Sequence, residues 1–209
     1  LSQRYRTELQ AEIPEVDAFY GKFDFDGILA ELKAELPEQN ACGARHTTTP
    51  SHYAYIKIAE GCNRACSYCA IPLIRGKYKS RSIDDIEQEV KALVEQGVVE
   101  FQLIAQDLTY YGKDLYQKFA LADLLVRLSD IPGVKWLRLH YAYPTQFPYD
   151  ILPVIREREN ICKYLDIALQ HSSDAMLQKM HRGITCAETE LLLDRIRQEV
   201  PGICLRTTL

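Results

Sequence analysis

Three cysteines stand close together in the sequence, at Cys62, Cys66 and Cys69. Three residues and then two separate the successive thiols, so one loop can present all of them to one metal centre. Structural zinc sites use four protein ligands, whereas a centre held by three protein ligands keeps one coordination position open. The spacing therefore favours a cubane iron–sulfur cluster with one open iron, although the common ferredoxin spacings use four cysteines per cluster. A zinc site with Cys42 as fourth ligand remains an alternative.

The chain has seven cysteines in all, an odd number with uneven spacing. Secreted disulfide scaffolds are smaller, richer in cysteine and usually even in their cysteine count, so we expect a reducing, cytoplasmic compartment. Cys162 and Cys204 lie in apolar, strand-like runs, where a buried thiol behaves as a small hydrophobic residue. Cys42 and Cys186 are assigned no role.

After residue 52 the hydrophobic pattern alternates between strands and helices. This alternation predicts a parallel sheet with right-handed crossovers, either open or curled into a barrel. Because the chain stops in a fifth predicted strand, we expect an α/β fold forming a partial (β/α) barrel that is truncated after that strand. Strands are expected at 53–59, 98–105, 134–140, 163–169 and 203–209, and helices at 83–96, 119–129, 149–158, 174–180 and 188–199.

Polar and aromatic side chains gather where these predicted strands end. In parallel α/β folds, ligands bind at the carboxyl ends of the strands. Together with the cysteine loop after the first strand, these side chains therefore predict one site on one rim of the sheet. They are Gln106, Asp107, His140, Tyr141, Tyr143, Gln170, His171 and Arg206.

The first part of the chain differs in character from the rest. Residues 1–40 contain a polar lead and then an amphipathic helix with apolar residues at helical spacing, which Pro37 ends. Residues 41–52 are rich in polar residues, Gly, Thr and Pro, and are interpreted as a linker. Residues 53–209 are interpreted as the main domain, incomplete at its carboxyl end.

The composition is that of a globular protein, with 47% hydrophobic and 26% charged residues among 209. The net charge of −4 argues against a basic nucleic-acid surface over the whole chain, but not against a local patch. No apolar run approaches the ~20 residues that a membrane helix needs, so we expect no membrane association. Because the sequence begins at Leu1 without a signal pattern, we expect a fragment of a longer protein.

The stretch CNRACSYC at residues 62–69 resembles the CxxxCxxC signature of radical S-adenosylmethionine enzymes. Similarity to the methylthiotransferase branch continues through RLHYAYP at 138–144, YLDIALQHSSDAMLQKMHRG at 164–183 and LRTT at 205–208. The last two motifs resemble the ribosomal-protein aspartate methylthiotransferases (RimO type) more than their tRNA-modifying relatives (MiaB type). Residues 1–40 resemble the tail of that family's amino-terminal domain.

The resemblance implies two cofactors. The three clustered cysteines would hold a 4Fe-4S cluster, and its open iron would bind S-adenosylmethionine. One electron would then cleave this cofactor reductively to a 5′-deoxyadenosyl radical. In the full-length enzyme, the radical would act on the β-carbon of an aspartate in a small-subunit ribosomal protein, which receives a methylthio group. The expected contacts to S-adenosylmethionine are Tyr68, Gln106, Gln170 and Arg206, and no side chain is assigned a catalytic role of its own.

The chain also departs from this family. Its members carry a second 4Fe-4S cluster on three further cysteines of the amino-terminal domain, and a carboxyl-terminal domain that recognises the substrate. Neither domain is complete in these 209 residues. We therefore expect this chain to bind cluster and cofactor without completing methylthiolation. A one-electron reductant, a ribosomal-protein partner, a monomeric state and a cytoplasmic location are expected as well.

Several of the polar residues also have ordinary structural interpretations. His140 and His171 are expected to be hydrogen-bonded residues of a pocket rather than metal ligands. Tyr141 and Tyr143 could border a substrate channel, but aromatic residues at a strand end usually pack in the core. Asp107 is interpreted as a residue that orients another side chain.

Three other functions stay open from the sequence. A tRNA adenosine methylthiotransferase (MiaB type) would use the same radical core on a different substrate. A zinc-stapled binding module would use the clustered cysteines without catalysis. An iron–sulfur electron carrier would hold a cluster but would not cleave S-adenosylmethionine.

Overall fold

The computed structural model describes residues 4–21, 24–33 and 48–209, and the chain divides into two compact units, 1–44 and 45–209. The described part of the first unit contains helices α1 (Arg6–Glu12) and α2 (Phe25–Leu32). Helix α1 buries no residue, so it has no apolar stripe by which the sequence could predict it. Helix α2 ends where Lys33 turns left-handed at φ 50°. Pro37 and Cys42 lie outside the described residues.

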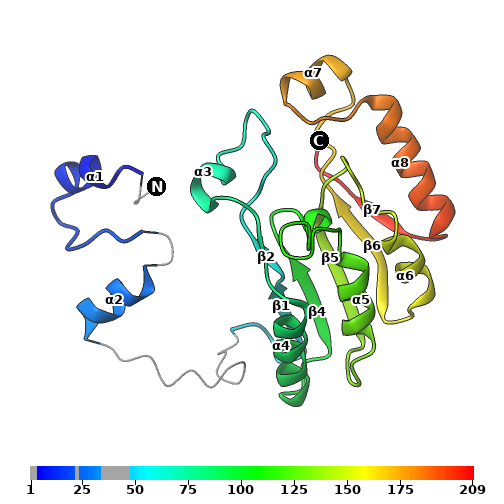
Figure 1. The fold of residues 1–209 in the computed structure, drawn as a ribbon, viewed down its shortest axis with the longest axis horizontal. Coiled ribbons are helices and arrows are strands. Elements are labelled where there is room, and N and C mark those ends of the chain that lie inside the picture. The colour runs from blue at the N-terminus through cyan, green and yellow to red at the C-terminus, as the bar shows by residue number, and fades with distance from the viewer. Residues whose placement is uncertain (1–3, 22–23, 34–47) are drawn as a thin grey trace. The chain divides into compact units, whose positions relative to one another are not determined.

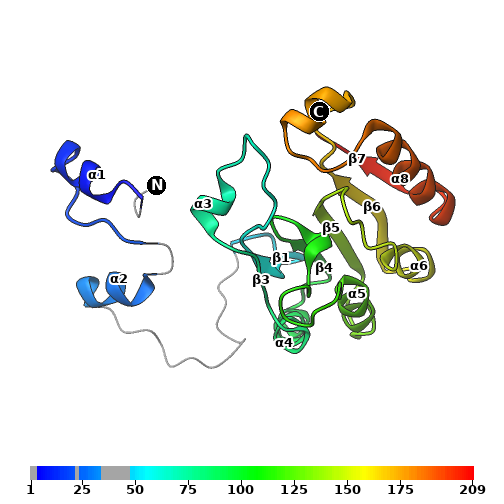
Figure 2. The same cartoon turned by 45° about the horizontal axis from the view of Figure 1, so that its top comes forward.

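The second unit is built on a five-stranded sheet in the order β1-β4-β5-β6-β7, in which every neighbouring pair is parallel. Helices follow the strands and lie along one face of this sheet (Figures 1 and 2). The predicted α/β fold with five parallel strands, open as in a partial barrel, is confirmed. The strands are β1 (Tyr53–Lys57), β4 (Glu100–Ile104), β5 (Trp136–Ala142), β6 (Ile161–Ile167) and β7 (Cys204–Arg206).

The core lies between the sheet and its four covering helices, which are α4 (Ile83–Glu95), α5 (Leu121–Ser129), α6 (Ile151–Glu157) and α8 (Cys186–Glu199). Alternate strand residues point to opposite faces, so each strand offers one face to these helices. Buried Phe101 and Leu103 of β4 thus alternate with Gln102, which stays partly exposed on the other face. Among the described helices, none is both long and apolar enough to span a membrane.

A small hairpin beside the main sheet forms the base of the cysteine loop. The sequence predicted one strand over 53–59, but β1 ends at Lys57 and a separate strand β2 (Ala59–Glu60) begins. The amide of Ile58 donates to the carbonyl of Ile104, and after this hydrogen bond the chain leaves the parallel sheet. Strand β2 then pairs antiparallel with β3 (Lys79–Ser80). Two short helical segments were not predicted, α3 (Ile71–Arg75) and the 3-10 turn η1 (Leu108–Tyr110). The helix predicted at 174–180 is confirmed as α7 (Asp174–Lys179).

The scattered cysteines differ in their exposure. Cys162 on β6 and Cys186 at the start of α8 are partly buried. The expectation of a buried thiol is wrong for Cys204, which is exposed. The reason is its place on β7, the edge strand of the sheet, where only one neighbour covers it.

Candidate active site

A cavity of about 450 Å³ opens at the carboxyl ends of the parallel strands. The three clustered cysteines line it, together with residues from the ends of β4, β5 and β6. Of the predicted cofactor contacts, Tyr68, Gln106 and Gln170 line the cavity, whereas Arg206 does not. The full lining is Cys62, Arg64, Cys66, Tyr68, Cys69, Ile71, Ala105, Gln106, Tyr141, Tyr143, Ala168, Gln170 and Arg182.

The cysteine loop is fixed at both of its sides by backbone hydrogen bonds. At the hairpin, the amide of Cys62 donates to the carbonyl of Gly76 over 3.1 Å. On the far side, the Ser67 amide donates to the carbonyl of Met180 (3.2 Å) and its hydroxyl to that of Lys179 (2.8 Å). The loop therefore spans from β2 to the end of α7, which lie far apart in the sequence.

The thiols differ in their surroundings. Burial raises the pKa of Cys62, although the backbone amide of Arg64 donates to its sulfur over 3.4 Å. The sulfur of Cys66 lies 3.4 Å from the hydroxyl of Tyr143 and 3.4 Å from Nη1 of Arg182. A guanidinium donor and a tyrosine hydroxyl thus both contact the middle cysteine of the loop, and the same hydroxyl donates to the carbonyl of Arg182 over 3.3 Å.

The three thiols line one cavity, and none of them is in a disulfide. In the described ranges, no group of three or more His, Cys, Asp or Glu side chains could hold a single metal ion. A single zinc ion needs all its sulfur ligands about 2.3 Å from one centre. A multi-iron cluster binds each thiolate at a different iron, so it accepts sulfurs that are farther apart. Three free thiols that line one cavity are a donor set that fits an iron–sulfur cluster with one open iron.

Arg64 is held in the cavity wall by a buried carboxylate. Its Nε donates to Oδ2 of Asp107 over 2.8 Å, and its Nη2 donates to the carbonyl of Thr145 over 3.1 Å. Asp107 is 1% exposed and also accepts the amide of Thr109. Asp107 does not line the cavity, and its contact with Arg64 is the orienting kind of contact expected from the sequence.

The two tyrosines at the end of β5 both line the cavity. The expectation that they pack in the core is wrong for Tyr141, which is 55% exposed and has a left-handed backbone at φ 66°. This backbone conformation turns the side chain out of the strand's regular alternation. Tyr143 is buried, yet it faces the cavity as well.

The histidines and Arg206 lie outside the cavity. Burial lowers the pKa of His140, against the opposing charge of Asp166, whose Oδ2 is 3.8 Å from Nδ1. Nε2 of His140 is buried without a hydrogen-bond partner among the described residues. Nδ1 of His171 accepts the amide of Ser173 over 2.9 Å. Arg206 donates to Asp166 over 2.9 Å, and its side chain is largely exposed.

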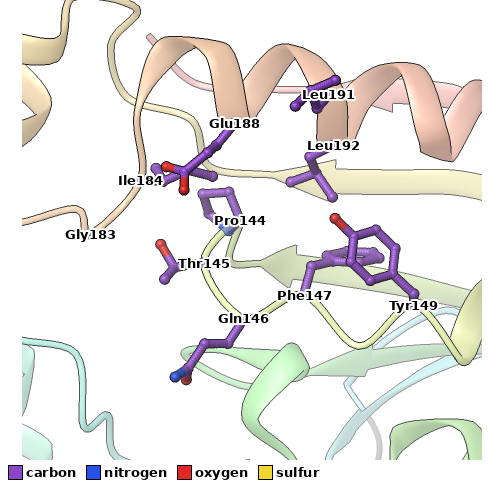
Figure 3. Close-up of a pocket in the computed structure, with 10 residues that line it drawn as sticks. All are labelled: Pro144, Thr145, Gln146, Phe147, Tyr149, Gly183, Ile184, Glu188, Leu191 and Leu192. Carbon is purple, nitrogen blue, oxygen red and sulfur yellow. The ribbon is translucent and has the colours of Figure 1, made fainter.

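A second hollow of about 300 Å³ lies beside the start of α8 (Figure 3). Apolar side chains such as Phe147 and Leu192 face each other across it. Its one carboxylate, Glu188, accepts the amide and hydroxyl of Thr185 and so caps the helix. No cysteine lines this hollow, so the chemistry of the clustered thiols belongs to the first cavity alone.

Sequence reasoning missed two arginines of the cavity wall, Arg64 and Arg182. Both lie inside stretches that carried the family resemblance, Arg64 within CNRACSYC and Arg182 in the run ending MHRG. The position of Arg64 between two of the clustered cysteines was the sequence signal that could have placed it at the site. Arg182 could not be placed there from the sequence, because 116 residues separate it from Cys66, the thiol that it contacts in space.

A partial parallel barrel with three cysteines in the loop after its first strand defines the core of a radical S-adenosylmethionine enzyme. The chain belongs to the Radical SAM superfamily, whose family model matches residues 56–209. The superfamily predicted from the cysteine motif is therefore confirmed.

Curated relatives match the whole chain. It is 60% identical over 209 residues to the ribosomal protein uS12 methylthiotransferase RimO of Parabacteroides distasonis and 62% identical to that of Porphyromonas gingivalis. The chain spans about half of each, 48% of their length. Among solved structures, the radical S-adenosylmethionine methyltransferase TsrM of Kitasatospora setae shares the fold with a TM-score of 0.59 at 17% identity, over 80% of this chain and 34% of that one.

Proposed function

We propose that this chain is the radical core of a methylthiotransferase that modifies an aspartate of ribosomal protein uS12. The observation that supports the proposal most is that three free thiols line the same cavity as Tyr68, Gln106 and Gln170. The similarity to the uS12 methylthiotransferases, at about 60% identity over the whole chain, supports this substrate over tRNA. Since the chain spans about half of those relatives, the complete reaction is proposed for the longer protein.

In this proposal, Cys62, Cys66 and Cys69 hold a 4Fe-4S cluster and leave one iron for S-adenosylmethionine. When bound, this pair of cofactors supplies a one-electron cleavage that yields a 5′-deoxyadenosyl radical. The thiols suit the cluster because they stand in one loop that is hydrogen-bonded at both sides. A second cluster belongs to the amino-terminal part of the longer protein.

Gln106 is the clearest candidate to orient S-adenosylmethionine. Its Nε2 donates to Oε1 of Glu60 over 3.2 Å, which fixes the amide group. Its Oε1 is buried and has no partner among the described residues, although the side chain lines the cavity. An unpaired buried acceptor costs free energy, so a donor such as the amino group of a bound ligand would satisfy it.

Other side chains would enclose the cofactor. Tyr68 is 52% exposed at the cavity, where an adenine ring could pack against it. Ala105, Ala168 and Ile71 make much of the wall apolar, which excludes water from a reactive radical. Arg206, paired with Asp166 outside the cavity, stays a prediction.

The proposal includes the partners expected from the sequence. The longer protein would draw its electrons from a one-electron reductant and act as a cytoplasmic monomer on uS12. The uS12 named for the relatives supports a ribosomal-protein partner.

The test is anaerobic reconstitution with iron and sulfide, followed by an assay for 5′-deoxyadenosine under a strong reductant. We expect the wild-type chain to form 5′-deoxyadenosine and Cys66→Ser to form none. Cys162→Ser is the matched control, because Cys162 is a partly buried thiol outside the cavity, and it should retain activity. Methylthiolation of a uS12 peptide by the full-length protein, with no reaction on tRNA, would identify the substrate. A colourless wild type that binds zinc would contradict the proposal.

A further inference from the structure

The ring of Tyr143 contacts two arginines of the cavity wall, Arg64 and Arg182. The Cζ atoms of Arg64 and Arg182 lie 4.2 Å and 4.1 Å from the centroid of this ring. Both guanidinium groups therefore contact the same aromatic ring. Both distances are well inside the limit of about 6 Å for a cation–π contact.

The two cations differ in how their charge is balanced. Arg64 has a direct counter-ion, the buried carboxylate of Asp107. Arg182 is 3% exposed, and its Nη2 donates to the carbonyl of Ala168, yet no carboxylate in the described parts of the chain pairs with it. Its Nε is buried without a partner there as well. Burying a cation without an anion costs free energy, so a negative charge next to Arg182 would stabilise the site.

The nearest group that can carry such a charge is the sulfur of Cys66. Nη1 of Arg182 lies 3.4 Å from this sulfur, and the hydroxyl of Tyr143 lies at the same distance from it. The hydroxyl of the tyrosine that both arginines contact thus lies against the same sulfur that Arg182 reaches directly. The sulfur of Cys62 accepts the backbone amide of Arg64, but among the described residues no side-chain donor reaches the sulfur of Cys62 or Cys69.

We propose that Arg64, Tyr143 and Arg182 form a cation–π stack that sets the reduction potential of the cluster through the sulfur of Cys66. This inference rests on the proposed assignment of Cys66 as a cluster ligand. The three are positioning residues, since they act through the ligand sulfur and not on a reacting atom.

The sign of the effect follows from the charge. Reduction adds one electron, so the reduced centre is one unit more negative than the oxidised centre. Hydrogen bonds and positive charge at a ligand sulfur stabilise the more negative state and therefore raise the reduction potential. The stack makes the centre easier to reduce, and it distinguishes the iron bound by Cys66 from those bound by the other two cysteines.

The test is a redox titration of the reconstituted full-length protein, followed by electron paramagnetic resonance, in wild type and four variants. Arg182→Gln removes the charge, and we expect about tenfold less reduced cluster at a fixed poise, a shift of about 59 mV to more negative potential. Tyr143→Phe removes the hydroxyl dipole that contacts the sulfur of Cys66 and should shift the potential in the same direction by less. Arg182→Lys keeps the charge and should restore part of the shift.

Arg195→Gln is the matched control, because Arg195 stacks on Tyr149 at 3.7 Å outside the cavity. Its potential should equal that of wild type. The iron bound per chain is measured for every variant. If Arg182→Gln does not bind the cluster, the reduction potentials of Arg182→Lys and Tyr143→Phe test the inference instead. Loaded variants with the wild-type potential would overturn the inference while leaving the proposed function intact. A wild type that binds no cluster would instead refute the proposed function.

Discussion

Gly61, which directly precedes the first clustered cysteine, should not tolerate a side chain. Its backbone is left-handed at φ 81°, and a Cβ built there would lie 2.2 Å from the carbonyl oxygen of Lys77 and 2.7 Å from that of Gly76. Real Cβ atoms essentially never approach closer than 3.0 Å. Both contacts are to backbone, which cannot rotate away as a side chain could. Gly61→Ala must therefore push the cysteine loop away from the segment that leads into β3.

The cost can be estimated from the contacts that this movement breaks. A non-glycine residue in the left-handed region costs about 1–2 kcal/mol. Opening the hairpin also sacrifices the hydrogen bond from Cys62 to Gly76, which contributes about 1 kcal/mol, and strains the short β2–β3 pairing. We expect Gly61→Ala to lower the free energy of unfolding by about 3 kcal/mol and to lower the iron bound per chain.

Gly97→Ala separates the cost of a left-handed backbone from the cost of the clash with neighbouring backbone. Gly97 is also left-handed, at φ 93°, but a Cβ there would meet nothing within 4 Å. This variant should lose only about 1–2 kcal/mol and should bind as much iron as wild type. Urea unfolding and iron analysis of the reconstituted variants provide both readouts. Equal losses of stability in the two variants, with full iron in Gly61→Ala, would refute the close approach of the loop to Lys77.

Three further substitutions test the fold around the site. Thr185→Ala removes the capping box that Thr185 forms with Glu188, and it should cost about 1 kcal/mol in urea unfolding. Phe101→Ala opens a cavity on the fully buried face of β4 and should cost about 3–5 kcal/mol; a loss below about 1 kcal/mol would contradict this packing. Because burial lowers the pKa of His140, the unfolded state takes up a proton first as the pH falls through the ordinary histidine value of about 6.5. Stability should therefore fall below that pH until the folded pKa is passed, and His140→Gln should flatten this part of the curve in melts between about pH 7.5 and 5.

The main sheet could be predicted from the sequence because its signals are local. Runs such as 98–105 and 134–140 are apolar at strand length, and the helices between them repeat apolar residues at helical spacing. Each of the five predicted strands has a counterpart within a few residues in the structure. The break between β1 and β2 could not be predicted, since it depends on the pairing of β2 with β3, whose partners are fixed by tertiary contacts.

The site was predictable only in part. The strand ends placed Gln106 and Gln170 at the cavity, because the carboxyl ends of parallel strands share one rim. Arg206 was expected there for the same reason, but its side chain turns to Asp166 on the neighbouring strand. Arg182 reaches the thiols from the chain after α7, a contact that no local pattern encodes. The exposure of Tyr141 depends on its left-handed backbone, which the sequence does not signal for a tyrosine.

In the proposed site, three thiolates hold the cluster and leave one iron open for S-adenosylmethionine. Electron paramagnetic resonance of the reduced, reconstituted protein, recorded before and after this cofactor is added, shows whether that iron is open. A cluster with an open iron should give a spectrum that changes when S-adenosylmethionine binds. A fully loaded cluster whose spectrum stays the same at saturating S-adenosylmethionine would contradict the account.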